Sequence, residues 1–275
     1  MSGILYVVAT PIGNLEDITL RAVRTLREVS LIAAEDTRHT KKLLNHLGIQ
    51  ATLESYHEHN EAKKSDKLVR ILESGKNIAL VSDAGTPVVS DPGVRLVSKA
   101  LEKGIKVSPI PGASAAIATL SVAGLRADEF TFLGFIPERS TLRENFFTKI
   151  RSTPSTYILY ESPARLLKSL EVMATFIPNS KVVVGRELTK IHEELLSGTP
   201  EEILKTLKDR KIKGEITIVL YLEKEDLSVE DGLNLLQSLL DEKLPLKEAA
   251  RIVAKETGLS KSEIYKEGLR IKKNI

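Results

Sequence analysis

The sequence predicts a protein of two α/β domains followed by a small C-terminal helical domain. Three observations predict this organisation. Short apolar runs alternate strictly with helical patterns through residue 122, a second series of apolar runs follows Gly124, and only helical periodicity remains after about residue 227. We therefore place the three domains at residues 1–122, 123–225 and 226–275.

Composition fits this picture and excludes several classes of function. The chain has 275 residues, 42% of them hydrophobic and 28% charged, which is typical of a globular protein with room for two domains. Cysteine is absent, which excludes a disulfide framework, a thiolate nucleophile and a cysteine-ligated metal. No apolar run is long enough for a membrane span and no signal-peptide pattern opens the chain, so we expect a cytoplasmic protein without a membrane partner.

In the first domain, the apolar runs lack polar alternation, which indicates strands buried on both faces of a sheet. Between them, apolar residues such as Leu20, Val23 and Leu26 recur at helical spacing. Strict strand–helix alternation favours a mostly parallel sheet with helices on its faces. We expect the strands at residues 4–9, 31–34, 52–56, 78–81 and 106–110.

The second domain shows a different texture, because some of its strands are close in sequence and a mixed sheet is expected. Its strands are predicted at 130–135, 156–160, 181–185, 195–197 and 215–222, and its helices at about 140–150, 163–176 and 200–209.

The last domain should contain three helices, at about 228–241, 246–257 and 260–272. Ala254, Gly258 and Ile264 have the spacing of a helix-turn-helix, in which a small residue, a turn glycine and a packing residue recur. From Lys243 onward, nine lysine and arginine residues face only four acidic ones. We interpret this pattern as a nucleic-acid-binding element. The alternatives are solvated helix faces, which are the commoner case for such charge, and a helical support for the fold or for a dimer.

The stretch from residue 79 to 93 is the strongest candidate for a binding site. A predicted buried strand ends there in two aspartates, two glycines, two prolines and two serines. Ligands bind at the carboxyl edge of such sheets. Small residues allow a ligand to approach the backbone, and Asp83 can accept hydrogen bonds from hydroxyl or amine groups. The strand ends at 10–14 and 111–115 should meet it at the same edge; the alternative is an ordinary turn.

Several common motifs are missing, and their absence narrows the chemistry. The sequence contains no G-x-G arrangement and no phosphate-binding P-loop. His57 and His59 form the one H-x-H pair, and no further ligands for a metal stand at useful spacing. The remaining small and acidic strand ends favour a nucleoside-type cofactor over NAD or ATP, and we expect no metal.

Eight motifs in order give the chain a family resemblance. Together they resemble the small-subunit ribosomal RNA methyltransferases of the tetrapyrrole methylase superfamily, and the resemblance covers the whole chain. The motifs lie at residues 6–19, 34–38, 55–61, 81–87 with 90–93, 111–115, 134–137, 161–163 and 185–190.

The resemblance implies two α/β domains of the tetrapyrrole methylase type, with S-adenosylmethionine in the cleft between them. It also implies methyl transfer to the ribose 2′-hydroxyl of a cytidine in the decoding region of 16S ribosomal RNA, and a homodimer. The loop at residues 9–14 departs from the glycine-rich loop of the tetrapyrrole-modifying members, which argues against a tetrapyrrole substrate.

The resemblance also suggests residues for the cofactor. They are Pro11, Asp83, Ala84, Gly85, Val88, Ser114, Ala115, Tyr160 and Ile216.

For the substrate side, cations are expected to hold phosphates, and a carboxylate or an imidazole is expected to accept the hydroxyl proton. The candidate substrate-binding residues are Arg38, Glu58, Asn60, Arg186 and Lys190, and the candidate catalytic residues are Glu35, Asp36, His57 and Glu187. In the alternative view, Asp36–Arg38 and Glu187–Arg186 pairs only tie loops together.

Two other functions stay open at this point. One is a methyltransferase that acts on a tetrapyrrole or another small molecule. The other is a non-enzymatic nucleic-acid-binding regulator built on the helix-turn-helix.

Overall fold

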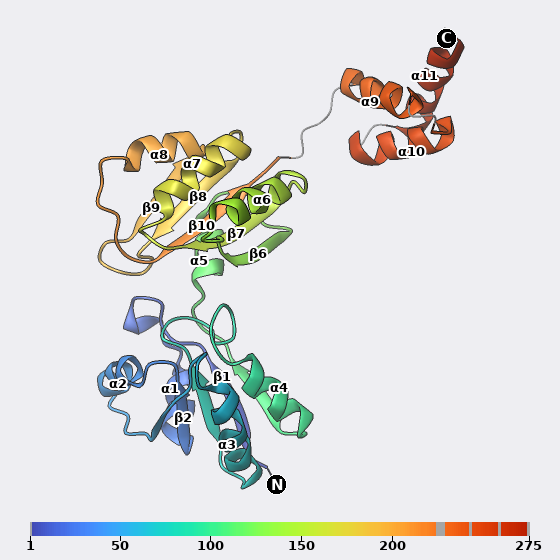
Figure 1. Cartoon of the computed structure of the whole chain (residues 1–275). Helices are drawn as coiled ribbons and strands as arrows, with labels where there is room; N and C mark the ends of the chain where they lie inside the picture. The colour runs from blue at the N-terminus through green and yellow to red at the C-terminus, as the bar shows by residue number, and fades with distance from the viewer. Residues whose placement is uncertain (1, 224–228, 242–243, 258–259, 274–275) are drawn as a thin grey trace. The chain divides into compact units, whose positions relative to one another are not determined.

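The computed structural model describes residues 2–223, 229–241, 244–257 and 260–273. The chain forms two compact units, residues 1–222 and residues 223–275. The first unit contains two five-stranded sheets, and the regular elements described in the second are all helices (Figure 1). Among the helices of the described ranges, none has the length and apolar character that a membrane crossing requires.

The first sheet is fully parallel, as predicted. Its strand order is β3-β2-β4-β1-β5, and every paired neighbour runs in the same direction. The strands are β1 (Ile4–Val8), β2 (Leu31–Ala34), β3 (Leu53–Ser55), β4 (Ile78–Val81) and β5 (Lys106–Ile110).

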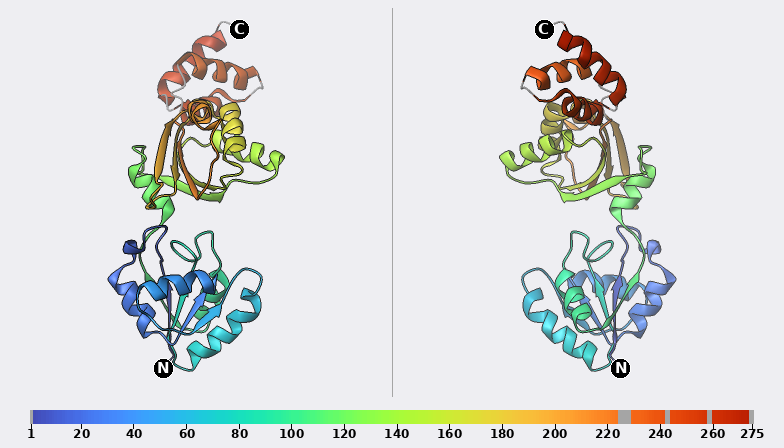
Figure 2. Two further views of the ribbon diagram at one scale, coloured as in Figure 1. Left: turned by 90° about the vertical axis from the view of Figure 1, so that its left-hand side faces the viewer. Right: turned by 90° about the vertical axis from the view of Figure 1, so that its right-hand side faces the viewer.

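Burial on both faces explains why these strands are apolar without alternation. In β4, Ile78 and Leu80 pack under α3 (Glu61–Glu73) and α4 (Val94–Glu102). Ala79 and Val81 point to the opposite face, where α1 (Leu20–Glu28) and α2 (Thr37–His46) cover them. Figure 2 shows helices on both sides of this sheet.

The order of the strands creates a crevice at their carboxyl ends. β4 and β1 are neighbours, but the α-helices that follow them, α4 and α1, lie on opposite faces of the sheet. Such a reversal point is where open α/β sheets bind ligands. The two loops are joined there, because the Thr10 N–H donates to the Gly85 carbonyl at 2.9 Å and the Gly85 N–H donates back at 3.1 Å.

The second sheet is mixed, which confirms that prediction. Its order is β6-β7-β10-β8-β9, with β6 and β7 parallel and the other pairs antiparallel. The strands are β6 (Phe130–Phe135), β7 (Thr156–Glu161), β8 (Lys181–Arg186), β9 (Glu194–Gly198) and β10 (Ile216–Tyr221).

Helices cover both faces of the second sheet too. One apolar cluster joins it to α6 (Ser140–Arg151), α7 (Leu166–Phe176) and α8 (Pro200–Leu207). The other face carries α5 (Ala115–Val122), through Ala116 and Leu120 against Ile158 and Val219. The helix that ends at residue 122 therefore packs on the second sheet, and the domain boundary placed there stays a prediction.

The second unit consists of α9 (Val229–Asp241), α10 (Leu246–Thr257) and α11 (Lys261–Lys273), which confirms the helical prediction. Ile264 is buried against α9 and α10, and Ala254 packs against the same cluster. Helices α10 and α11 approach closely at Gly268, where an added Cβ would lie 2.3 Å from Leu246 Cδ1. Gly258, the turn residue of the predicted pattern, lies outside the described residues.

Gly93, immediately before α4, offers a test of how tightly the loop after β4 is built. It has φ of +143°, and an added Cβ would lie 2.8 Å from both Leu80 Cδ2 and Val88 Cγ2. We expect Gly93→Ala to lower the free energy of unfolding by about 2–4 kcal/mol, since backbone strain and overpacking add. Gly104→Ala is the matched control, because Gly104 has φ of +66° with nothing within 4 Å. It should cost only about 1 kcal/mol of strain. Equal losses in urea unfolding would contradict the packing argument.

Candidate functional site

A cavity of about 360 Å³ lies at the carboxyl edge of the first sheet. This volume is within the usual range of small-molecule sites, about 300–1,000 Å³. Its walls come from the loops after β1, β2, β4 and β5, from the ends of β6 and β7, and from the start of β10. The lining residues are Ile12, Glu35, 83–86, 89–91, 114–115, Phe135, 160–163 and 214–217.

The loop after β4 reaches the cavity through an unusual backbone path. Val88 and Ser90 adopt φ of +78° and +64°, values that side chains disfavour, and Gly85 has φ of +77°. Strained backbone of this kind is retained mainly where function requires a fixed geometry. Here it places Asp83 and Asp91, at the two ends of the loop, against the same cavity.

Three carboxylates of the cavity have no basic partner. The Asp83 carboxylate accepts from the Asp36 N–H at 3.0 Å, and the Asp83 N–H donates to the Glu35 carboxylate at 3.4 Å. No ion pair in the described part of the chain includes Glu35, Asp83 or Asp91. Negative charge therefore gathers at one end of the cavity without an ion-pair partner in the described part of the chain.

Burial is the main influence on the pKa of two of these groups, Glu35 and Asp91. Burial raises the pKa of Glu35, and the nearby Asp83 charge adds to the effect. Burial, followed by repulsion from Glu35, raises the pKa of Asp91 to about 6. A cation placed in the cavity would relieve this repulsion. Within the described residues, no group of three or more histidine, cysteine or acidic side chains has the arrangement to hold a metal.

The other two acidic residues of the cavity are already paired. Glu161 forms an ion pair with Arg165 at 2.7 Å, accepts from the Ser162 N–H at 2.7 Å and accepts from the Ser169 hydroxyl. Glu215 pairs with Lys190 at 3.0 Å. These two carboxylates stabilise the walls and add little free charge.

An aromatic and apolar wall faces the carboxylates. Tyr160 packs edge-to-face against Phe132 and Phe135, with ring centroids 5.0 and 5.5 Å apart. Burial raises the pKa of the Tyr160 hydroxyl. Ile216, at the start of β10, is buried and also lines the cavity. A flat aromatic ring would find apolar contact on this side.

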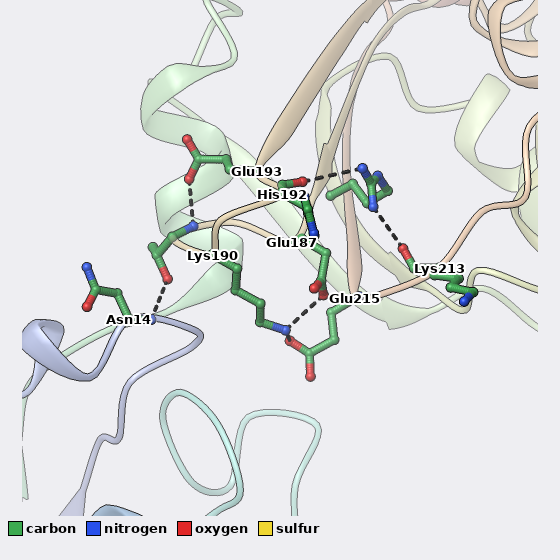
Figure 3. Close-up of polar contacts among 9 residues, drawn as sticks. Asn14, Glu187, Lys190, His192, Glu193, Lys213 and Glu215 are labelled. Atoms are coloured by element: carbon green, nitrogen blue, oxygen red, sulfur yellow. Dashed lines mark hydrogen bonds and ion pairs between the residues drawn. The ribbon is translucent and has the colours of Figure 1, made fainter. Parts of the chain in front are cut away.

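The loop at residues 187–193 is fixed by a set of polar contacts, shown in Figure 3. Lys190 pairs with Glu187 at 2.8 Å and with Glu215, and the Glu215 N–H donates to Glu187 at 2.9 Å. The loop also contacts the first domain, since the Asn14 N–H donates to Thr189 Oγ1 at 3.0 Å. Lys190, the sequence-derived candidate for phosphate binding, thus braces a wall of the cavity.

Arg186 and Arg38 lie in different surroundings. The Arg186 guanidinium donates to Glu194 at 2.9 Å and to the carbonyls of Lys213 and His192 at 3.1 and 3.3 Å. Glu187 pairs with Lys190 in place of Arg186. Arg38 does pair with Asp36, at 3.1 and 2.8 Å, and its side chain is 89% exposed. This pairing lowers the pKa of Asp36.

The His57 group lies at the start of α3, outside the cavity lining. The Asn60 amide lies 3.0 Å from His57 Nε2, and its oxygen accepts from the His57 N–H at 3.0 Å. His57 Nδ1 is buried without a hydrogen-bond partner in the described structure. Glu58 is exposed. The His57 charge is nevertheless close enough to lower the pKa of Glu35.

The cavity brings together eight of the residues that the sequence suggested: Glu35, Asp83, Ala84, Gly85, Ser114, Ala115, Tyr160 and Ile216. Ile12 and Val89 line it where their neighbours Pro11 and Val88 were expected. The remaining candidates lie outside the lining, namely Asp36, Arg38, His57, Glu58, Asn60, Arg186, Glu187 and Lys190. The individual roles of all these residues stay predictions.

Among the lining residues to which sequence reasoning gave no role are Asp91, Phe135 and Glu161. A signal for them was present, because each falls in one of the eight motifs, at 90–93, 134–137 and 161–163.

Comparisons with known proteins agree along the whole chain. The sequence profile of the tetrapyrrole (corrin/porphyrin) methylases matches residues 4–204, and that of the RsmI C-terminal HTH domain matches residues 226–272.

Two curated relatives are named ribosomal RNA small subunit methyltransferase I. The protein from Escherichia coli O157:H7 is 47% identical, with 97% of this chain and 95% of the relative aligned. The protein from Halalkalibacterium halodurans is 45% identical, with 96% and 93% aligned.

Solved structures share the fold at lower identity. A diphthine synthase superposes with a TM-score of 0.63 at 18% identity, over 80% of this chain and 92% of its own. A uroporphyrin-III C-methyltransferase from Thermus thermophilus, complexed with S-adenosylhomocysteine, gives 0.57 at 18% identity, over 79% and 97%.

Proposed function

Because this chain belongs to the tetrapyrrole (corrin/porphyrin) methylases, and among them to the ribosomal RNA small subunit methyltransferase I family, we propose a specific reaction. The protein methylates small-subunit ribosomal RNA with S-adenosylmethionine as the donor. The acceptor that we propose is the ribose 2′-hydroxyl of a cytidine in the decoding region of 16S ribosomal RNA. The names of the relatives favour ribosomal RNA over a tetrapyrrole as substrate.

The observation that best supports the donor site is the cluster of Glu35, Asp83 and Asp91, three cavity carboxylates without an ion-pair partner among the described residues. S-adenosylmethionine supplies a methyl group on a positively charged sulfonium. Carboxylates within a few ångströms of a cation stabilise it strongly in a partly buried site. Dinucleotides and nucleoside triphosphates would bring negative charge instead, and no lysine, arginine or histidine lines the cavity to receive it.

The remaining lining fits the rest of the donor. Ala84, Gly85, Ser114 and Ala115 are small and leave backbone groups accessible. The wall of Tyr160, Phe135 and Ile216 offers apolar contact for an adenine ring. We therefore keep the assignment of these residues, with Pro11 and Val88 behind them, to the cofactor side.

The same charge pattern restricts where RNA binds. Since the cavity has no basic lining, phosphates are expected to stay outside it while the target ribose reaches inward. Arg38 is the most exposed candidate to hold a phosphate. Arg186 uses three of its five N–H donors and Lys190 two of its three, so each retains a donor. Glu58 and Asn60 complete the proposed substrate side.

We also propose a homodimer that acts in the cytoplasm, where small subunits are found. Support for the dimer comes from the edge strand β6 and the adjacent helix α5. Phe130 is 41% exposed there, and Ile117 and Val122 are also exposed. Exposed apolar side chains along an unpaired strand are typical of an interface.

The central test of the reaction uses unmethylated small ribosomal subunits and methyl-labelled S-adenosylmethionine. Full-length protein should transfer label to 16S ribosomal RNA, and nucleoside mass spectrometry should recover 2′-O-methylcytidine. Label on a base, label on another nucleotide, or no transfer at all would overturn the proposal.

Asp83 provides a test of the donor site that is independent of RNA. We expect Asp83→Asn to weaken S-adenosylmethionine binding about tenfold or more, about 1.4 kcal/mol, because it removes a charge near the sulfonium. Binding of S-adenosylhomocysteine, which lacks that charge, should weaken much less in calorimetry. Asp66→Asn, at an exposed position on α3 outside the cavity, is the control. Equal losses of affinity for both ligands would show that the Asp83 charge does not interact with the sulfonium.

The helical unit is proposed to contact RNA through α11, which occupies the recognition-helix position of a helix-turn-helix. Lys261 and Lys266 are exposed on this helix. Replacing both by alanine should weaken binding to small subunits and reduce the slope of log affinity against log salt by about 1.4–1.8. Lys103→Ala with Lys106→Ala, at the amino edge of the first sheet, is the matched control. An unchanged slope would make the helical unit a structural element.

A further inference from the structure

Asp91 lies against the donor cavity, where the assignment above gives it only a share of the negative charge. It follows Ser90, whose backbone φ is +64°, and precedes Pro92 and the tightly packed Gly93. The chain around it is therefore held in one path, and its carboxylate contributes to the cavity wall. A side chain that is fixed at a site of methyl transfer is positioned to act on the acceptor.

Two of the other cavity carboxylates, Glu161 and Glu215, form ion pairs, and Asp91 does not. Glu161 is held by Arg165, and Glu215 by Lys190. Asp83 accepts from the Asp36 N–H, and Glu35 accepts from the Asp83 N–H. Asp91 interacts with the Ser82 hydroxyl alone among the groups that lower its pKa. Unlike Glu161 and Glu215, Asp91 is in no ion pair of the described residues, and it retains capacity to accept a proton.

Three proton acceptors suggested by the sequence lie outside the cavity lining. Asp36 is bound by the Arg38 guanidinium, and Glu187 is bound by Lys190. His57 is tied to Asn60. A general base must first be able to reach the proton that it accepts. None of these three residues lines the cavity, whereas Asp91 does.

On the premise of the proposed function, we propose that Asp91 is the catalytic residue that accepts the proton of the ribose hydroxyl. The hydroxyl oxygen bonds to the methyl carbon while the carbon–sulfur bond breaks, its electron pair stays on sulfur, and the hydroxyl proton passes to the Asp91 carboxylate. The neutral carboxyl group then releases the proton to water. Atoms and charge balance without another reactant.

The surroundings of Asp91 suit this task. The groups that face it are Glu35, after β2, Asp83, after β4, and the Tyr160 hydroxyl on β7. Burial and the two carboxylates raise the pKa of Asp91 to about 6, so it is a stronger base than an ordinary aspartate and is still ionised at neutral pH. Burial also raises the pKa of Tyr160, which stays protonated.

The pH dependence follows from this assignment. The reaction requires ionised Asp91, so the single-turnover rate should rise tenfold per pH unit below about pH 6 and level off above it. Asp91→Asn should lower the plateau by about 10²–10⁴-fold and remove the slope. Glu35→Gln removes a charge that raises the pKa of Asp91, and it should shift the slope to lower pH.

A stability measurement separates this role from a structural one. In the folded protein the Asp91 pKa lies above its ordinary value of 3.8, so the folded state favours the protonated form. Its contribution to stability is present at low pH and is lost as pH rises through about 6. Asp91→Asn should therefore raise the thermal midpoint relative to wild type at pH 8 but not at pH 4. A residue that only supports the fold would lower the midpoint at both.

The experiment compares full-length wild type, Asp91→Asn, Glu35→Gln and the control Asp66→Asn on small subunits. Each protein is assayed for single-turnover methylation from pH 5 to 8, for S-adenosylmethionine affinity by calorimetry, and for thermal unfolding. Loss of rate and slope in Asp91→Asn at saturating S-adenosylmethionine, together with the expected stability pattern, supports the proposal.

Two results would overturn it. In one, Asp91→Asn keeps its rate at saturating S-adenosylmethionine within tenfold of wild type. In the other, the acid slope stays in place in Glu35→Gln, a readout that holds even where Asp91→Asn fails to fold. Failure of wild type to methylate ribose would instead refute the proposed function, so the two failures are distinguishable.

Discussion

The structure of the site depends on one constraint, the burial of β4 on both faces. A strand packed under helices on either side has no position for polar residues until it ends. The chain therefore changes character at Ser82 and Asp83, at the carboxyl edge of the sheet. Because the α-helices after β4 and the adjacent β1 lie on opposite faces, the edge is left open at that point. The Thr10–Gly85 hydrogen bonds keep the two loops together beside the opening.

Electrostatics then separates the two ligands of the reaction. Glu35, Asp83 and Asp91 make the cavity suitable for a cationic donor and unsuitable for phosphates. The RNA backbone must be held elsewhere, and exposed cations such as Arg38 and those of α11 are available for it. Ionised Asp91 lowers the stability of the folded protein, because its pKa is raised in the folded state. Such a cost is expected where the charge serves catalysis.

Local sequence predicted the strands, the helices and the cavity edge well, because burial on both faces and turn residues leave direct signals. Asp83, Gly85 and Ser114 were found in this way. The contacts of Lys190 with Glu187 and Glu215 could not be predicted in this way. They depend on the antiparallel pairing of β8 and β10, which places Arg186 opposite Ile216. Glu187 and Glu215 become neighbours only through that register. The sequence likewise could not show that the Arg186 guanidinium donates to Glu194 and two carbonyls, since those partners are positioned by the loops that follow.

The most direct measurement of the account is a crystal structure of the protein with S-adenosylmethionine. We predict that the donor lies inside the cavity. Its sulfonium end should face Glu35, Asp83 and Asp91, and its adenine should lie against Tyr160 and Ile216. Density for the donor outside this cavity, or with the sulfonium turned away from all three carboxylates, would contradict it.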